Sequence, residues 1–394
     1  MGCAGRLVAR RRFLRQVAAV APLGVALSPA ARLLAAEACD EGPLGELIAE
    51  LPLYGVGSTP APLGRIVGGS GLDARLFTDL SRLAPDRLVT SIDEMFVRTA
   101  APPRLANPPA EWRIALGDGD GGSLTAAALA ASARPMGPHL IECAGNSNPQ
   151  HFGLLSAVEW DGVPLTDVVA RMTRPAGATA VLVVGIDDEG PSTRSVPGAS
   201  WILPAADLDQ LGAFLAVGIN GRPLTPDHGA PVRLVVPGWY GCAWIKWVTA
   251  IRWVGSDEPS TAQMLEYAVR TQQDGRPALA RDYAAPVIDT AATPIRVEQR
   301  RVDGRIEYRV VGIVWGGTRP VDRLVIRFGP RDPGTPFAVC PAPRTHRIWS
   351  LWSYRWRPDA PGYYDIGLRV ADPSVPTRRL DLSYYVRRVR IDEV

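Results

Sequence analysis

Short segments that alternate apolar and polar residues recur at close spacing along the C-terminal part of the chain. A period of two is typical of strands with one buried face, and strands so closely spaced pair most simply with their sequence neighbours. The expected strands are residues 306–314, 323–327, 346–356, 362–370 and 380–389. This pattern predicts an immunoglobulin-like β-sandwich domain over residues 290–394.

The middle of the chain has a different pattern, in which β-branched runs alternate with helical segments. We expect strands at residues 180–186 and 232–236, and helices at residues 123–133 and 165–172. Such a mixture is typical of an α+β domain. We place this domain at residues 91–285.

Two further segments complete the predicted organisation. Residues 39–90 are rich in proline and glycine without a long periodicity, so we expect an extended arm. Residues 257–294 have few apolar runs and end in a segment suited to crossing between domains, which places the boundary near residues 285–292. A chain of 394 residues, 46% of them hydrophobic, is long enough for two cores.

The first residues resemble an export signal. Arg10-Arg11-Arg12-Phe13-Leu14 precedes a modestly apolar run at residues 17–34 and the small-residue sequence Ala36-Glu37-Ala38. This order is typical of a twin-arginine signal peptide, here residues 1–38, and predicts a periplasmic protein that is exported already folded. A membrane anchor is the alternative, but Pro22 and Pro29 interrupt the run, which is shorter than the roughly 20 apolar residues of a membrane span.

The charge balance limits the class of partner. Removing residues 1–38 would change the formal net charge from +3 to about −2, because that segment contains six arginines and one glutamate. A near-neutral chain without a basic stripe is unlike a protein that binds nucleic acid. Small molecules or a redox protein are the expected partners.

The cysteines are far apart in the sequence. One lies in the expected signal, and the others are Cys39, Cys143, Cys242 and Cys340. The absence of a Cys-x-x-Cys pair excludes zinc ribbons, iron–sulfur runs and attached haem. An exported protein could oxidise two of these cysteines to a disulfide, although a chain of this size does not need one. We expect Cys242 and Cys340 to be simply buried, since neither lies in a motif of its own. Lipid attachment at Cys39 is an alternative to plain cleavage, although Glu37 suits that cleavage site poorly.

Cys143 lies in the turn-like sequence Glu142-Cys143-Ala144-Gly145-Asn146. A single cysteine is most often a small buried residue, but a second segment changes this interpretation. Residues 228–233, His-Gly-Ala-Pro-Val-Arg, precede a strand, a Pro-Gly pair and then Lys246-Trp247. This order resembles the pterin-binding segment of the sulfite oxidase family, and Cys143 to Asn146 resembles its metal-cysteine motif.

Further motifs extend the resemblance over residues 92–394. They are Phe96-Val97-Arg98, Trp160-Asp161-Gly162-Val163-Pro164-Leu165 with Asp167-Val168, Trp315-Gly316-Gly317 and Trp349-Ser350-Leu351-Trp352. The resemblance implies a molybdopterin-binding domain followed by a dimerisation domain, with Mo-molybdopterin as the cofactor. A soft thiolate suits high-valent molybdenum, and the pterin phosphate calls for fixed positive charge.

The resemblance also implies roles for single residues. Cys143 would be the metal ligand and a catalytic residue, with Arg98 at the substrate and Tyr283 as the active-site tyrosine that relays protons. The expected cofactor-binding residues are Phe96, Arg98, Cys143, Asp187, His228, Arg233 and Lys246.

The chain departs from the family where the substrate would bind. An arginine usually follows Cys-x-Gly-Asn, but here Ser147 does, and Ser350 replaces another arginine. Sulfite is a small dianion that needs strong positive charge, so the anion pocket looks depleted. We expect an exported enzyme that oxidises sulfite and passes electrons to an external cytochrome c, and a homodimer. A reductase of sulfoxides or N-oxides is the first alternative, and a cofactor-free binding protein is the second.

Overall fold

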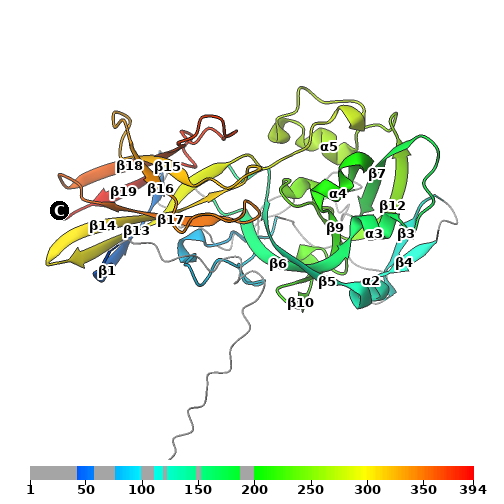
Figure 1. Cartoon of the computed structure of the whole chain (residues 1–394), viewed down its shortest axis with the longest axis horizontal. Helices are drawn as coiled ribbons and strands as arrows, with labels where there is room; N and C mark the ends of the chain where they lie inside the picture. The colour runs from blue at the N-terminus through cyan, green and yellow to red at the C-terminus, as the bar shows by residue number, and fades with distance from the viewer. Residues whose placement is uncertain (1–41, 57–75, 99–110, 119–121, 148–151, 187–198) are drawn as a thin grey trace, which may run out of the picture.

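The computed structural model describes most of the chain. The described residues are 42–56, 76–98, 111–118, 122–147, 152–186 and 199–394. The expected export signal, Cys39 and Asp187 lie outside them. Two groups of sheets lie side by side in Figure 1, with β1 and β13 to β19 on one side and β3 to β12 on the other. Within the described residues, no helix is both long and apolar enough to cross a bilayer.

Two five-stranded sheets form the N-terminal group. One has the order β4 (Ser123–Thr125), β3 (Arg113–Leu116), β12 (Val248–Gly255), β7 (Ala178–Gly185) and β8 (Ser200–Pro204). The other has the order β10 (Arg222–Pro223), β9 (Phe214–Ile219), β6 (Leu155–Pro164) and β5 (Arg134–Glu142), with β11 (Arg233–Val235) also paired to β9. The first sheet is mixed, because β12 runs parallel to β3 and antiparallel to β7.

The described helices of this group are short. They are α2 (Ala126–Ser132), α3 (Leu165–Val169), α4 (Leu208–Leu211) and α5 (Ala262–Tyr267). The helix expected at residues 123–133 begins later, because residues 123–125 form β4 and the Thr125 side chain accepts a hydrogen bond from the N–H of Ala128 as the N-cap. These elements confirm the α+β character of the domain.

Single-turn 3-10 helices supply much of the remaining structure. They are η1 (Leu80–Arg82), η3 (Ala205–Asp207), η4 (Pro226–His228), η5 (Gly241–Ala243), η6 (Val269–Thr271) and η7 (Ala280–Asp282). Turns of this kind are typical connectors. Three of them, η4, η5 and η6, lie near Cys143 and shape its surroundings.

The C-terminal group consists of two antiparallel sheets. One has the order β1 (Glu46–Leu51), β13 (Ala291–Val302), β14 (Arg305–Trp315) and β17 (Ser350–Trp356). The other has the order β16 (Thr335–Ala338), β15 (Arg323–Arg327), β18 (Gly362–Val370), β19 (Arg387–Ile391) and β2 (Tyr54–Gly55). Strand β13 packs against β18 and β19 of the other sheet. The immunoglobulin-like topology stays a prediction.

The structure corrects the expected boundaries in two places. Part of the N-terminal arm belongs to the C-terminal sheets, because β1 pairs with β13 and β2 pairs with β19. The strand expected at residues 380–389 begins only at Arg387, because the preceding residues form turns that bring Arg378 and Tyr385 toward Glu142. Local alternation could not anticipate this contact between the two groups of sheets.

Candidate active site

A cavity of about 140 Å³ lies at the end of β5. Cys143 follows that strand directly and lines the cavity, together with Phe96 and Arg98. The rest of the wall comes from η4, β11, η5 and α5. The structure therefore brings together the two segments that resemble molybdopterin-binding motifs.

Cys143 is 9% exposed and is held in a defined turn. The backbone N–H of Gly145 lies 3.4 Å from its Sγ atom and donates to it. Burial raises the pKa of the Cys143 thiol, while the positive charges of Arg98 and Arg270 act in the opposite direction. These donors and charges favour the anionic form of the sulfur, which is the form that binds a metal.

Glu142 and Asn146 fix the turn on either side of Cys143. The buried Glu142 carboxylate accepts hydrogen bonds from Asn146 Nδ2 at 3.1 Å and from Trp315 Nε1 at 2.9 Å. Asn146 Oδ1 accepts the backbone N–H groups of Gly153 and Leu154 at 3.2 and 3.0 Å. Asn146 thus has a structural role in the motif.

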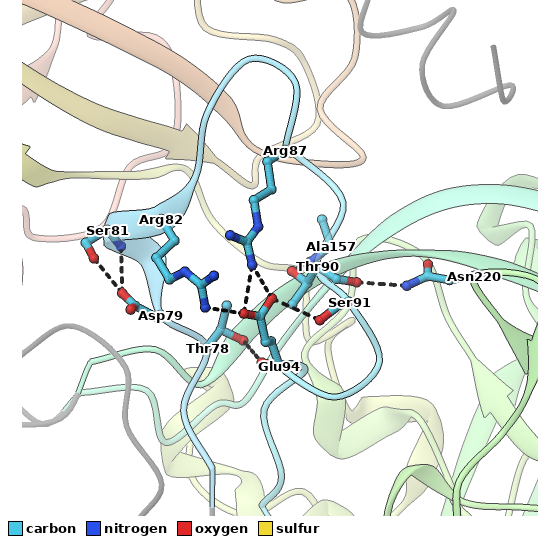
Figure 2. Close-up of polar contacts among 10 residues, drawn as sticks. All are labelled: Thr78, Asp79, Ser81, Arg82, Arg87, Thr90, Ser91, Glu94, Ala157 and Asn220. Atoms are coloured by element: carbon cyan, nitrogen blue, oxygen red, sulfur yellow. Dashed lines mark hydrogen bonds and ion pairs between the residues drawn. The ribbon is translucent and has the colours of Figure 1, made fainter. Parts of the chain in front are cut away.

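Residues 76–98, which include Phe96 and Arg98, are braced by Glu94 (Figure 2). Its carboxylate accepts hydrogen bonds from Arg82, from Arg87 at 2.6 and 2.7 Å, and from the hydroxyl of Ser91 at 2.9 Å. The bond from Arg87 is the main reason that the pKa of Glu94 is lowered. This cluster stabilises the segment that carries Phe96 and Arg98 to the cavity.

The same segment is bonded to β6 from its other side. Thr78 Oγ1 lies 2.6 Å from Ser156 Oγ, and the N–H of Phe96 donates to Ser156 Oγ at 3.1 Å. Thr90 bonds to Ala157 of β6 and accepts from the Asn220 side chain, as Figure 2 shows. The position of Arg98 is therefore set by the sheet that also carries Cys143.

Arg98 and Arg233 have buried nitrogen atoms with unused hydrogen-bonding capacity. Arg233 is 3% exposed, and its guanidinium donates only to the backbone carbonyls of His228 and Trp244, at 3.1 and 3.3 Å. Within the described residues, Arg233 Nε and Arg98 Nη1 have no partner. Burial lowers the pKa of Arg233 to about 9. Buried cations with spare donors fit an anionic group such as the pterin phosphate.

His228 lines the cavity, and its ring is buried. Its Nδ1 atom lies 2.7 Å from Thr225 Oγ1, and Nε2 lies 3.3 Å from the carbonyl oxygen of Phe96, to which it donates. Burial lowers the pKa of His228 to about 4, so the ring is neutral at pH 7. Both ring nitrogens have partners within the protein, so His228 helps to position Phe96, and its contact with the cofactor stays a prediction.

Lys246 reaches the cavity across Gly229. Its Nζ atom donates to the Asp227 carbonyl at 3.0 Å and lies 4.6 Å from the centre of the Trp247 ring. Gly229 has a φ of +100°, and a Cβ there would lie 3.0 Å from Lys246 and 3.1 Å from Arg233. Glycine is required at this position both by backbone conformation and by space, which explains the His-Gly pair in the motif.

The tyrosine that lines the cavity is Tyr267 of α5, and Tyr283 is not part of the described lining. The Tyr283 hydroxyl lies 2.6 Å from Thr271 Oγ1, and its ring packs edge-on against Trp201. Burial raises the pKa of Tyr283 to about 12. The role of Tyr283 as the active-site tyrosine therefore stays a prediction, and Tyr267 of α5 is a second candidate because it lines the cavity with Cys143.

The two other described cysteines, Cys242 and Cys340, differ from each other in their state. Cys242 is a free, buried thiol, as predicted, but it lines the same cavity as Cys143. Burial is the main cause that raises the pKa of the Cys242 thiol, and the nearby Cys143 raises it further. Cys340 is disulfide-bonded, which corrects the expectation that it is simply buried.

Sequence reasoning missed the contribution of α5 and η6. Tyr267 and Arg270 are three residues apart, so they share one side of the helical turn. The guanidinium of Arg270 lies 5.6 Å from the centre of the Tyr267 ring. That spacing was the available signal, but it belongs to no motif.

Comparisons with known proteins agree with these motifs. A family model described as the oxidoreductase molybdopterin binding domain matches residues 100–262. Sulfite oxidase of Gallus gallus is 28% identical over 327 residues, which cover 75% of this chain and 69% of that protein. Mitochondrial sulfite oxidase of Macaca fascicularis is 29% identical over 237 residues, and the match covers 54% of this chain and 42% of that protein.

A solved structure shows that the fold extends over both groups of sheets. The crystal structure of the sulfane dehydrogenase SoxCD from Paracoccus pantotrophus matches with a TM-score of 0.58 at 18% identity. The match covers 91% of this chain and 95% of that chain. The domain match and the relatives show an oxidoreductase that binds the molybdenum cofactor and is similar to sulfite oxidases.

Proposed function

We propose that this enzyme oxidises a small sulfur oxyanion, with sulfite as the substrate. In this reaction sulfite gains one oxygen atom from water to become sulfate, and two protons and two electrons are released. The observation that carries the proposal is the position of the Cys143 thiol in a cavity that Arg98 enters with a free, buried Nη1 atom. The molybdenum cofactor, when bound, supplies oxygen-atom transfer and accepts the electron pair.

The side chains of the cavity have separate roles in this proposal. Cys143 binds the metal, while Arg233 and Lys246 hold the anionic end of the pterin. Arg98 binds the substrate through charge-assisted hydrogen bonds. The hydroxyl of Tyr267 lines the cavity and donates or accepts the proton that moves with water.

The test uses protein purified from cells able to make the molybdenum cofactor. Metal analysis should give about one molybdenum per chain, and a content near zero would contradict the enzyme assignment. The holoenzyme is then assayed with sulfite and cytochrome c, and separately with a sulfoxide and a reduced dye. We expect turnover with sulfite, and turnover confined to the sulfoxide would show a reductase.

The electron acceptor and the assembly are parts of the same proposal. We expect an external cytochrome c to take the electrons singly, because the sequence contains no haem-attachment motif. We also propose a homodimer formed through the C-terminal sheets, on the strength of the family resemblance. Light scattering at micromolar concentration should give twice the chain mass, and a monomeric mass would contradict the dimer.

We propose export to the periplasm by the twin-arginine route. Two independent features support it, namely the order of residues 10–38 and the disulfide of Cys340. Disulfides form and persist in oxidising compartments such as the periplasm. Replacing Arg10 and Arg11 by lysine should leave the protein in the cytoplasmic fraction, and unchanged periplasmic recovery would contradict this route.

A further inference from the structure

The motif that carries Cys143 lacks the arginine expected after Asn146, and Ser147 stands in its place. A single guanidinium binds a dianion weakly in water, because its few charge-assisted hydrogen bonds must replace a strong hydration shell. The described part of the chain offers a second guanidinium from another element. It belongs to Arg270, in η6.

Arg270 lies on the same side of the turn as the cysteine sulfur. A Cβ atom added to Gly145 would lie 3.6 Å from Cys143 Sγ and 3.8 Å from Arg270 Nη1. The Cys143 sulfur and the Arg270 guanidinium therefore both border the space next to the Gly145 backbone. The positive charge of Arg270 acts on both cavity thiols, Cys143 and Cys242.

Among the described residues, the Arg270 guanidinium contacts an aromatic ring and forms no ion pair with a carboxylate. Its guanidinium lies 5.6 Å from the centre of the Tyr267 ring. Among the described residues it takes part in no hydrogen bond and no ion pair, although it is exposed and a carboxylate, Glu266, lines the cavity from the preceding turn. Its hydrogen-bond donors are therefore available to a ligand.

Two arginines with free donors enter this region from different elements. Arg98 has a buried, unpartnered Nη1 atom and lines the cavity, and Arg270 lies beside Gly145 at its edge. The acidic residues on the wall are Glu266 of α5 and Asp227 of η4, and the basic ones are Arg98, Arg233 and Lys246. With Arg270 added, the positive charges outnumber the negative ones. Paired guanidinium groups are suited to tetrahedral or pyramidal oxyanions with two negative charges.

We propose that Arg270 is a substrate-binding residue that replaces the missing motif arginine and, with Arg98, holds a doubly charged oxyanion beside Cys143. This assignment rests on the proposed function, since it names the residue that selects an anionic substrate. It also makes anion binding measurable without turnover, because sulfate is the product and does not react further.

The experiment compares holoenzymes carrying Arg270→Ala, Arg270→Lys and the control Arg276→Ala. Arg276 is another exposed arginine, six positions further on, and it does not line the cavity. Sulfate binding is measured by titration calorimetry at low salt. We expect the Kd to rise about 10-fold or more in Arg270→Ala, as for the loss of hydrogen bonds to a charged group. Arg270→Lys should lie between that variant and the wild type, and Arg276→Ala should match the wild type.

Steady-state kinetics with sulfite provide a second readout. Arg270→Ala should raise KM about 10-fold with a much smaller change in kcat, because it removes binding and leaves the metal ligand in place. Equal sulfate binding by wild type and Arg270→Ala, or no sulfate binding by the wild type, would overturn the assignment. If the wild type binds sulfate through Arg270 yet does not oxidise sulfite, the proposed reaction fails and the anion site stands.

Discussion

The carboxylate of Glu142 and the guanidinium of Arg378, 236 positions apart in the chain, form a two-pronged ion pair at 2.6 and 2.8 Å. The Glu142 side chain is fully buried, and that of Arg378 is 10% exposed. Since Glu142 immediately precedes Cys143, the C-terminal part of the chain helps to fix the position of the proposed metal ligand. The same carboxylate accepts from Trp315 at the end of β14.

Replacing Glu142 by glutamine should destabilise the protein strongly. The change leaves the Arg378 charge buried without its partner, and breaking a buried pair in this way costs about 3–5 kcal/mol. Urea unfolding of the variant and the wild type measures the difference in the free energy of unfolding. The double variant Glu142→Leu/Arg378→Met should recover part of the loss, because it leaves no uncompensated charge.

A matched control for this prediction is the exposed pair of Arg319 and Asp372. Their side chains are 55% and 49% exposed, and the atoms are 2.7 Å apart. Asp372→Asn should cost less than about 1 kcal/mol, as is usual for surface ion pairs. Similar decreases in the free energy of unfolding for Glu142→Gln and Asp372→Asn would show that the buried pair stabilises the protein no more than the exposed one.

The two free thiols of the cavity should differ in their response to substitution. Cys143→Ser should reduce sulfite oxidation to background, because a hydroxyl is a poor substitute for a thiolate as a ligand of molybdenum. Cys242→Ser should keep its molybdenum and its activity within a few-fold, since it follows neither β5 nor the motif turn. Metal analysis and the cytochrome assay measure both. Loss of activity in Cys242→Ser alone would reverse the assignment of the metal ligand.

Replacing Tyr267 or Tyr283 by phenylalanine should have different effects on kcat. Tyr267→Phe should lower kcat about 100-fold, because proton transfer by a positioned side chain typically contributes at least that factor. Tyr283→Phe should leave kcat within about threefold and cost about 1 kcal/mol of stability, through loss of the hydrogen bond to Thr271. Stopped-flow kinetics and urea unfolding provide the two readouts. A larger fall in kcat in Tyr283→Phe than in Tyr267→Phe would support the active-site role that the sequence predicts for Tyr283.

His139 should make stability depend on pH. The ring is 3% exposed and bonded to the Met136 carbonyl, and burial, helped by the charge of Arg347, lowers its pKa to about 4. Between about pH 6.5 and pH 4 the unfolded chain binds the proton more readily than the folded one, so stability falls as the pH falls through this range. The loss from pH 7 to pH 4 should be about 3 kcal/mol.

The variant His139→Phe isolates this effect. It keeps an aromatic ring next to Phe214, whose ring centre lies 5.7 Å from that of His139, and it cannot titrate. The difference in the free energy of unfolding between wild type and variant should change by about 3 kcal/mol between pH 7 and pH 4. The other titrating groups cancel in this difference, including His228. A difference that is constant with pH would contradict the lowered pKa.

The sequence allowed the residues that lie within compact motifs to be identified. Cys143, Arg233 and Lys246 do line one cavity, and each has local neighbours that fix its conformation, such as Gly229 beside Lys246. Strands β15 and β18 were predicted with their observed bounds, because their alternation reflects one buried face.

The parts that were missed depend on contacts between distant segments. Tyr267 and Arg270 lie near Cys143 because α5 and η6 pack beside the cavity, and their three-residue spacing belongs to no motif that would indicate this. The turns near Tyr385 replace an expected strand because Arg378 bonds to both Glu142 and the Tyr385 hydroxyl. Such long-range contacts carry no local periodicity from which they could be inferred.

The pairing of β1 with β13 has a consequence for the order in which the chain can fold. Glu46 of β1 lies opposite Arg301, so the sheet joins residues made early in synthesis to residues made more than half a chain later. Pairing over such sequence separations is slow, because a long loop must close first. The ion pair of Glu142 can likewise form only after Arg378 has been synthesised. The C-terminal sheets and the surroundings of Cys143, the proposed metal ligand, are completed only after residues 378–391 have been synthesised.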